Sequence, residues 1–176
     1  MHISIIGAGP IGCYCGSLLA KAGHEVDIYE EHAEIGLPIQ CTGLLTKDFD
    51  QFNLPQESFL VNTFQEVEVN SPNGQKIVIL QTEYLVDRHK FDQYFAESAR
   101  KAGARIHLQH SFVRREGKEL IIKELQTKQE LRISPEIIIA ADGPLSKTAH
   151  AYGLSDFLWA KGMSGAIRVD SARIKN

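Results

Sequence analysis

The stretch that decides the fold is Ile3-Ser4-Ile5-Ile6-Gly7-Ala8-Gly9-Pro10-Ile11-Gly12. An apolar run that ends in closely spaced glycines is typical of a buried strand that turns directly into a helix. The helix is expected from about Pro10 to Ala22, and a second strand follows at Val26-Asp27-Ile28-Tyr29. The pattern therefore predicts a βαβ unit of the dinucleotide-binding type.

Each glycine of the turn has a structural role in such a unit. Gly7 lets the chain turn sharply out of the strand, Gly9 leaves room for a pyrophosphate, and Gly12 lets the helix lie close to the sheet. The expected helix begins at Pro10, and Ile11 is its second residue. Its N-terminus offers N–H groups and the positive end of the helix dipole to phosphates.

An acidic pair closes the second strand. Glu30 follows the glycine turn at close to the spacing of about 20 residues found in dinucleotide-binding units, and Glu31 stands beside it. Glu30 is expected to accept hydrogen bonds from the 2′-hydroxyl of an adenosine ribose. The same carboxylate would repel a 2′-phosphate.

Composition predicts a soluble enzyme piece of one core, or of one domain plus a fragment. The chain has 176 residues, of which 43% are hydrophobic. With a net charge of −3, it lacks the excess of positive charge that is typical of nucleic-acid-binding domains. Its apolar runs are shorter than the roughly 20 residues of a membrane span, so no transmembrane segment is expected. Three cysteines without an export signal favour reduced thiols in the cytoplasm.

The seven histidines are scattered along the chain. His107 and His110 stand three apart in one predicted strand, where they would point to opposite faces. The sequence therefore predicts no metal site.

The pattern changes after the second strand. An irregular loop over Glu34–Gly43 is followed by two β-rich runs, Asn62–Asn70 and Gln75–Gln81, joined by Ser71-Pro72-Asn73-Gly74. Asn-Gly is a strong hairpin signal. The hairpin predicts an antiparallel insert that begins a second lobe.

The chain then returns to the first domain. A helix over about Lys90–Ala102 has one apolar face and stops at Gly103. The expected strands that follow are a third strand at Arg105–Leu108, a meander of Ser111–Glu116, Glu119–Leu125 and Glu130–Ile133, and a fully apolar, buried strand at Ile137–Ala141. The expected class is α/β, with a Rossmann-like domain at 1–60 and 82–156 and partial substrate-domain strands at 61–81 and 157–176.

Five motifs in this order carry a family resemblance: G-A-G-P-I-G, Y-E-E, P-I-Q-C-T-G, Y-L-V-D-R-H-K-F-D and A-A-D-G-P-L-S-K. Together they resemble the FAD-dependent geranylgeranyl reductases, within a larger flavoprotein group that includes aromatic hydroxylases. The resemblance runs from Ile3 to about Leu154. The segment Pro38–Gly43, P-x-x-C-x-G, is the part that points to the reductase branch.

The resemblance implies FAD as the cofactor. The glycine turn would surround the pyrophosphate, Cys41, Thr42 and Gly43 would lie near the isoalloxazine, and the backbone near Phe112 would touch adenine. The full set implied to contact the cofactor is Gly7, Gly9, Pro10, Ile11, Gly12, Glu30, Glu31, Gln40, Cys41, Thr42, Gly43, Arg88, Phe112, Asp142, Gly143 and Ser146.

Simpler readings of three of these residues stay open. Arg88 could be a surface residue at the start of a helix, and Cys41 could be a small buried apolar residue. Asp142 could be a turn former, which is favoured before glycine.

The resemblance implies reduction of isolated C=C bonds in geranylgeranyl or polyprenyl chains, a step of isoprenoid lipid biosynthesis. Hydride from reduced flavin must be paired with a proton donor, and Cys41 is the residue nominated for that role. NAD(P)H or ferredoxin would supply the electrons. The implied partner is an isoprenoid lipid, with peripheral membrane contact through a missing domain.

Family members usually run to more than twice this length and carry a later Gly-Asp-Ala motif that is absent here. The expectation is therefore an N-terminal portion of a longer protein or a split gene product. Two other functions stay open: a flavin-dependent aromatic monooxygenase, and a non-catalytic FAD-binding module completed by a partner chain. The cysteine loop favours the reductase, whereas the missing half favours the module.

Overall fold

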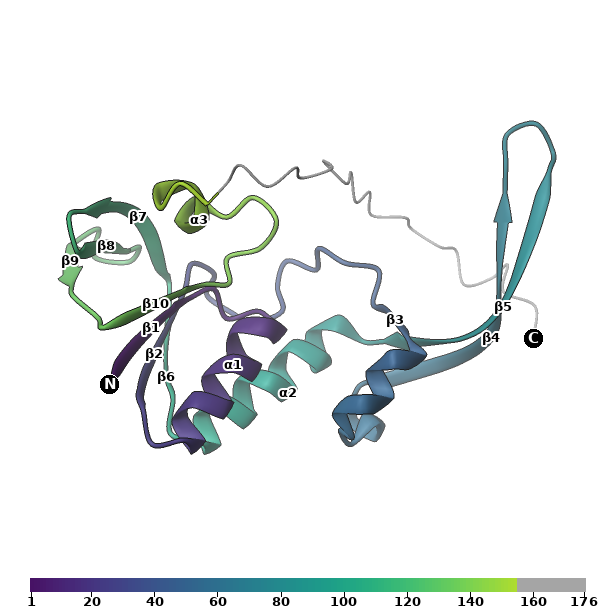
Figure 1. Cartoon of the computed structure of the whole chain (residues 1–176), viewed down its shortest axis with the longest axis horizontal. Coiled ribbons are helices and arrows are strands. Elements are labelled where there is room, and N and C mark those ends of the chain that lie inside the picture. The colour runs from purple at the N-terminus through teal and green to yellow at the C-terminus, as the bar shows by residue number, and fades with distance from the viewer. Residues whose placement is uncertain (155–176) are drawn as a thin grey trace. The chain divides into compact units, whose positions relative to one another are not determined.

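The computed structural model describes residues 1–154, which divide by their contacts into two units. Among the described residues the first unit contains 1–37 and 89–154, and the second contains 38–88. Each unit has its own sheets (Figure 1). The strand expected within 157–176 lies outside the described residues.

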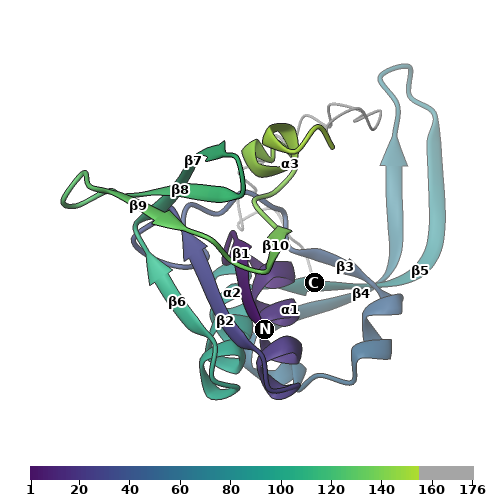
Figure 2. The same ribbon diagram turned by 60° about the vertical axis from the view of Figure 1, so that its left-hand side comes forward.

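The first unit is built on a four-stranded sheet in the order β10-β1-β2-β6, and all its strands are parallel. The strands are β1 (His2–Ile6), β2 (Glu25–Glu30), β6 (Arg105–Leu108) and β10 (Ile137–Ala140). Helices α1 (Pro10–Lys21) and α2 (Arg88–Lys101) lie together along one face of this sheet (Figure 2). The predicted βαβ unit and third strand are confirmed.

Close packing between α1 and the sheet explains why a small residue is needed in the helix. Ile5 of β1 and Ile28 of β2 are fully buried. A Cβ atom at Gly16 of α1 would lie 2.7 Å from Cδ1 of Ile28, so glycine allows the helix to approach this closely.

The predicted meander is confirmed as a three-stranded antiparallel sheet in the order β7-β8-β9. Its strands are β7 (His110–Glu116), β8 (Glu119–Glu124) and β9 (Glu130–Ile133). The cluster that joins it to the parallel sheet consists of Ile6, Tyr29, Phe112, Leu120 and Ile122, all buried. Beyond the meander, the short helix α3 (Lys147–Ala151) packs against β7.

Two expectations about the first unit are wrong. The last strand, β10, is not fully buried: Ile137 is 40% exposed, because β10 lies at the edge of the four-stranded sheet. His107 and His110 do not point to opposite faces of one strand. Gln109 between them has a left-handed backbone (φ 57°), so the chain turns from β6 into β7 and the two rings lie 5.7 Å apart.

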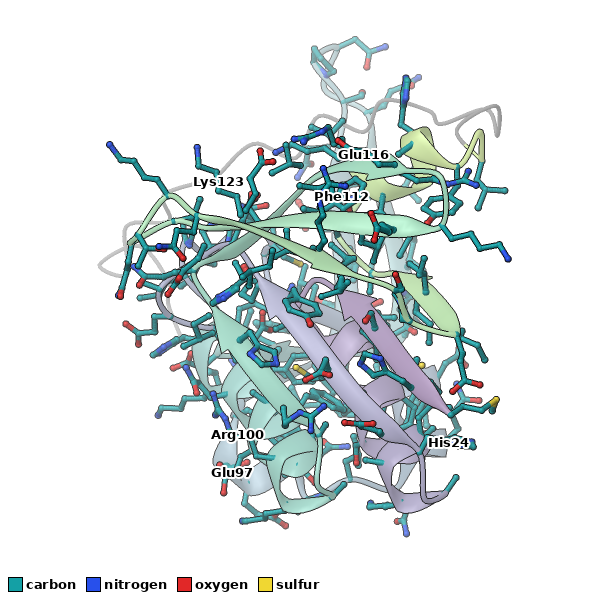
Figure 3. The ribbon with its side chains drawn as sticks, turned by 90° about the vertical axis from the view of Figure 1, so that its left-hand side faces the viewer. His24, Glu97, Arg100, Phe112, Glu116 and Lys123 are labelled. Carbon is teal, nitrogen blue, oxygen red and sulfur yellow. The ribbon has the colours of Figure 1, made fainter. Side chains whose placement is uncertain are left out.

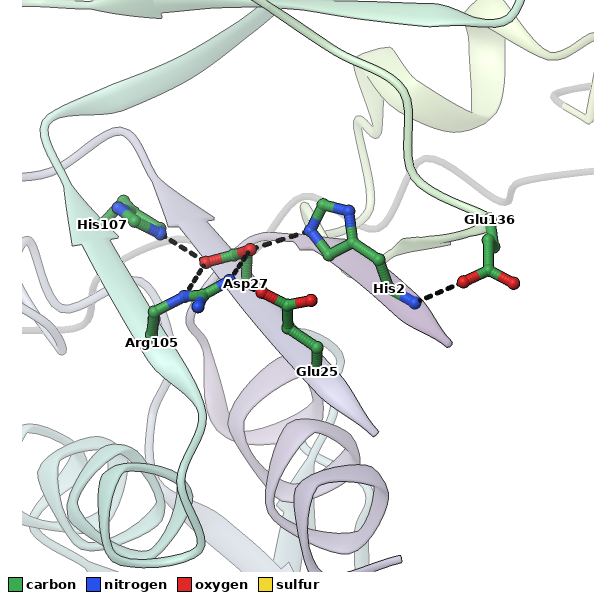
Figure 4. A network of polar contacts seen from close by, with 6 residues as sticks. All are labelled: His2, Glu25, Asp27, Arg105, His107 and Glu136. Carbon is green, nitrogen blue, oxygen red and sulfur yellow. Dashed lines mark hydrogen bonds and ion pairs between the residues drawn. The ribbon is translucent and has the colours of Figure 1, made fainter. Parts of the chain in front are cut away.

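A polar network joins three strands of the parallel sheet around Asp27, which is 5% exposed (Figure 4). Arg105 donates to both carboxylate oxygens from Nε and Nη2, each at 2.7 Å. Nε2 of His107 and Nε2 of His2 lie 2.7 Å and 2.8 Å from the same carboxylate. Burial opposes the charged form, but these hydrogen bonds outweigh it and hold the pKa of Asp27 well below its usual range.

The second unit contains a three-stranded antiparallel sheet in the order β3-β5-β4. Its elements are β3 (Leu44–Thr46), the 3₁₀ helices η1 (Lys47–Phe52) and η2 (Gln56–Ser58), β4 (Leu60–Asn70) and β5 (Lys76–Val86). The predicted hairpin is confirmed, with Gly74 N–H donating to Ser71 O at 3.0 Å in its turn.

The second unit is wider than the predicted insert at 61–81. Strand β5 continues to Val86, and its last residues pair with β3, so 82–88 belongs with the hairpin by contacts. Where the protein's domains begin and end stays a prediction.

Candidate functional site

The predicted site residues of the first unit gather at the carboxyl ends of the parallel strands. The glycine turn follows β1, Glu31 follows β2, and Asp142 follows β10. Figure 3 shows Phe112 and Glu116 of the meander beyond this end of the sheet, and His24, Glu97 and Arg100 at the opposite end. Ligands of open α/β sheets bind at the carboxyl ends of the strands.

Two glycines of the turn are required by the packing of the protein itself. Gly7 has φ 101°, and a Cβ atom there would lie 2.3 Å from the carbonyl oxygen of Ala141. A Cβ atom at Gly12 would lie 2.0 Å from the carbonyl oxygen of Gly7. Both positions therefore exclude a side chain whether or not a ligand is bound.

Gly9 differs from its two neighbours. Its φ of −67° suits any residue, and a Cβ atom there would meet nothing within 4 Å. Gly9 is the N-cap of α1, which has no side-chain cap and no acidic residue in its first turn. Because the fold does not require glycine here, the open space fits a group that approaches the backbone from outside, as the pyrophosphate of a dinucleotide does.

Glu30 organises the glycine turn, a role that the sequence did not predict. Its Oε2 accepts a hydrogen bond from Ala8 N–H at 2.8 Å. Its Oε1 accepts one from His32 N–H at 3.0 Å, and His32 Nδ1 lies 2.6 Å from the same oxygen. The spacing from which contact with a ribose was predicted also places Glu30 over the turn. Glu31 instead accepts a hydrogen bond from Ser111 Oγ at 3.1 Å.

The Asp-Gly motif holds the start of α3. Asp142 accepts hydrogen bonds from Ser146 Oγ and, at 3.0 Å, from Thr148 N–H. Ser146 Oγ in turn accepts one from Ala149 N–H at 2.8 Å. Gly143 has φ 81°. These bonds support the simpler reading of Asp142 as a residue of the turn, and the contact of Gly7 with Ala141 places that turn beside the glycine loop.

Phe112 is a core residue by its side chain, which is 5% exposed. It pairs with Ile122 across the meander, and a β-bulge follows it between Phe112 and Arg114. The expected contact of its backbone with adenine stays a prediction.

The remaining predicted residues lie in the second unit, in the loop before β3 and at the start of α2. Gly43 is buried with φ 78°, and its carbonyl accepts a hydrogen bond from Val86 N–H at 2.8 Å. A Cβ atom at Gly43 would lie 2.4 Å from Val86 O and 3.3 Å from Arg88 Cγ. Gly43 is therefore required by the loop's packing, while Gln40 and Thr42 are exposed.

Cys41 is exposed and free, so its reading as a small buried residue is wrong. Gly43 N–H donates to its sulfur at 3.5 Å. Partial burial raises the pKa of the Cys41 thiol, but the Gly43 bond and the charge and hydrogen bond of Arg88 outweigh it and lower the pKa below its usual value. Arg88 is half-buried at the first position of α2.

Residues 1–154 contain neither a cluster of metal-ligating side chains nor a helix that could span a membrane. No group of three or more His, Cys, Asp and Glu side chains in this part of the chain is arranged to hold a metal ion. No helix among the described residues has the length and apolar character to cross a membrane.

Comparison with known proteins gives a sequence match and several fold matches. The family described as NAD(P)-binding Rossmann-like domain matches residues 5–60. The digeranylgeranylglycerophospholipid reductase of Methanocaldococcus jannaschii is 32% identical over 160 residues, which is 86% of this chain and 40% of the reductase. The chain thus spans about 40% of the length of this relative.

Two solved structures show the same fold. A geranylgeranyl bacteriochlorophyll reductase-like protein from Thermoplasma acidophilum superposes with a TM-score of 0.78 at 24% identity, over 90% of this chain and 43% of that one. The flavin-dependent monooxygenase PieE, solved with FAD and substrate, has a TM-score of 0.64 at 15% identity, over 87% of this chain and 32% of its own.

The matched reductase and the motif set from the glycine turn to the Asp-Gly segment agree with each other, since the match extends over nearly the whole chain. The chain is thus similar, over most of its length, to the N-terminal part of a digeranylgeranylglycerophospholipid reductase.

Proposed function

We propose that the first unit binds FAD, with the pyrophosphate at the glycine turn and the adenosine ribose at Glu30. The observation that carries this proposal is the open space at Gly9, where the fold has no need of glycine but a ligand that approaches the backbone does. The uncapped start of α1 supplies N–H groups to the phosphates.

FAD is proposed rather than NAD(P) for two reasons. The family match at 5–60 describes the βαβ unit, which both kinds of dinucleotide use. The longer resemblance is to flavoproteins, including the fold neighbour solved with FAD. The carboxylate of Glu30 also disfavours the 2′-phosphate of NADP.

The activity proposed for the protein of which this chain forms part is reduction of C=C bonds in an isoprenoid lipid. FAD, when bound and reduced, supplies the hydride. The chain's own contribution is a proton, held on Cys41 Sγ. The exposed thiol and the lowered pKa support this role, because a general acid works best when its pKa is near the working pH.

The lipid substrate, the electron donor of NAD(P)H or ferredoxin type, and contact with a membrane surface belong to the same proposal. The lipid substrate follows the name of the relative, and this chain spans 40% of that relative's length. The electron donor and the membrane contact follow the family resemblance of the motifs. The fold likeness to PieE makes an aromatic monooxygenase the second candidate. Oxygen consumption without reduction of a polyprenyl double bond would favour the monooxygenase.

Flavin binding is tested by equilibrium dialysis of the chain against FAD, NADH and NADPH. Wild type is expected to bind FAD most tightly, and Gly9→Val to abolish binding while the circular dichroism spectrum is unchanged. Gly9→Ala is the matched control, because its single methyl group is smaller than the valine side chain. Equal or tighter binding of NADH would refute the proposal.

The role of Cys41 is tested in the complete protein with Cys41→Ser. Single-turnover reduction of a polyprenyl double bond is expected to fall by roughly 10²- to 10⁴-fold, as for loss of a general acid. FAD affinity and melting temperature should change little, because Cys41 is exposed. Unchanged turnover would remove Cys41 from the reaction.

A further inference from the structure

A cavity of about 620 Å³, open on one side, lies within the first unit between β7 and α3. Its volume falls in the range of roughly 300–1,000 Å³ that small-molecule sites occupy. Residues that line it include Val113, Arg114 and Arg115 from β7 and Lys147, His150 and Ala151 from α3. Lys147 ends the motif A-A-D-G-P-L-S-K but was given no role there, and the motifs do not include Arg115 or His150.

Arg115 is held in place by two contacts. Its Nε donates to the carbonyl oxygen of Gly117 at 2.6 Å, and its guanidinium carbon lies 4.4 Å from the centre of the Tyr152 ring. Within the described part of the chain, these partners are a carbonyl and a ring face, neither of which neutralises the charge. The terminal amino groups of Arg115 are therefore left for a ligand.

Lys147 and His150 reach the cavity because α3 is fixed at its start. Asp142 and Ser146 cap the first turn of α3, and the helix packs against β7. Lys147 Nζ lies 3.9 Å from Glu31, and its side chain is 69% exposed. An ion pair this long and this exposed is weak, so a bound anion can replace Glu31.

Arg114, on the same strand, differs from Arg115 because its positive charge is paired with carboxylates. It donates to Glu130 at 2.8 Å and to Glu116 at 2.7 Å. Its charge is therefore neutralised by two carboxylates of the meander. The cavity keeps positive charge from Arg115 and Lys147, in a chain whose net charge is −3.

We propose that this cavity binds a phosphate monoester or pyrophosphate group that is distinct from the cofactor phosphates at the glycine turn. The planar fork of Arg115 matches two phosphate oxygens at once, and Lys147 adds a point charge. A lipid headgroup and a nucleotide both carry such a group. The inference does not rest on flavin binding, because Arg115, Lys147 and His150 are not among the residues expected to contact the cofactor. Of that expected set, Phe112 also lines the cavity.

The test is calorimetric titration of pyrophosphate into the full chain at low salt, with and without saturating FAD. Arg115→Gln and Lys147→Gln are each expected to weaken pyrophosphate binding about tenfold, as for loss of a charge-assisted hydrogen bond. Lys21→Gln is the matched control: it removes the same charge from the C-terminal end of α1. FAD affinity should stay within about twofold in all three variants.

Three results would overturn the proposal: no binding of pyrophosphate at millimolar concentration, equal weakening in Lys21→Gln, or competition between FAD and pyrophosphate in wild type. Failure of FAD to bind leaves the pyrophosphate titration intact, so the two proposals fail separately. Titration with glycerol 1-phosphate and with adenosine 2′-monophosphate then distinguishes the sources. Preference for the first supports a lipid headgroup, and preference for the second supports a nucleotide.

Discussion

The two ends of the parallel sheet treat their polar groups differently. Toward the amino ends of the strands, Asp27 is enclosed by Arg105, His107 and His2, and its charge is fully used within the protein. At the carboxyl ends, the start of α1 has no side-chain cap and Gly9 borders open space. At the amino ends the charges are therefore neutralised within the protein, whereas the carboxyl ends combine a position that the fold requires, Gly12, with one that it leaves open, Gly9. Substitutions should therefore separate stability from binding.

The largest effect is expected within the glycine turn itself. Gly12→Ala should destabilise the fold by about 3 kcal/mol or more, because its Cβ atom would lie 2.0 Å from backbone. Urea unfolding measures the change. A stability equal to wild type would show that Gly12, like Gly9, is not needed by the fold, and would break the distinction within the turn.

Asp27→Asn should lower the free energy of unfolding by about 2 kcal/mol at pH 7, since Arg105 loses a charged partner. The pKa of Asp27 is lowered in the folded state, so its contribution is present above the unfolded pKa of 3.8 and is lost as the pH falls further. Urea unfolding at pH 7 and pH 3 should therefore show a difference between wild type and variant that shrinks in acid. A constant difference would contradict the role of the charge.

Glu30→Gln should lower the free energy of unfolding by about 1 kcal/mol, a typical value for one hydrogen bond. The amide oxygen can still accept from Ala8 N–H, whereas the amide nitrogen cannot accept from His32. The same variant should lower the affinity for FAD, because the proposed charge-assisted hydrogen bond to the ribose becomes a neutral one. A loss of stability without any loss of FAD affinity would leave Glu30 as a residue of the turn alone.

The smallest effect is expected at Gly9. Gly9→Ala should leave the free energy of unfolding within about 1 kcal/mol of wild type, because its φ of −67° suits alanine and its Cβ atom meets nothing. Thermal and urea unfolding check this. Strong destabilisation would show that Gly9 serves the fold and would remove the observation on which the FAD proposal rests.

Much of the first unit could be predicted because its signals are local. The apolar run of β1, the glycine turn and the helix stop at Gly103 lie within a few residues of the elements that they define. The hairpin was predicted for the same reason, since Asn73-Gly74 forms its turn. The error at His110 arose because Gln109 adopts a left-handed backbone, which its residue type does not signal. The error at Ile137 arose because the place of β10 at the edge of the sheet is set by pairing between strands distant in sequence.

The sequence by itself determined the βαβ unit, the meander and the resemblance to the reductases, because periodicity and motif order are properties of the chain. Only the tertiary structure separated Gly9 from Gly7 and Gly12, since the atoms that a Cβ would meet come from Ala141 and from the folded turn. It likewise brought Glu30 to Ala8 and Arg115 beside α3. Those relations depend on distance in space, which side-chain type and spacing along the chain do not specify.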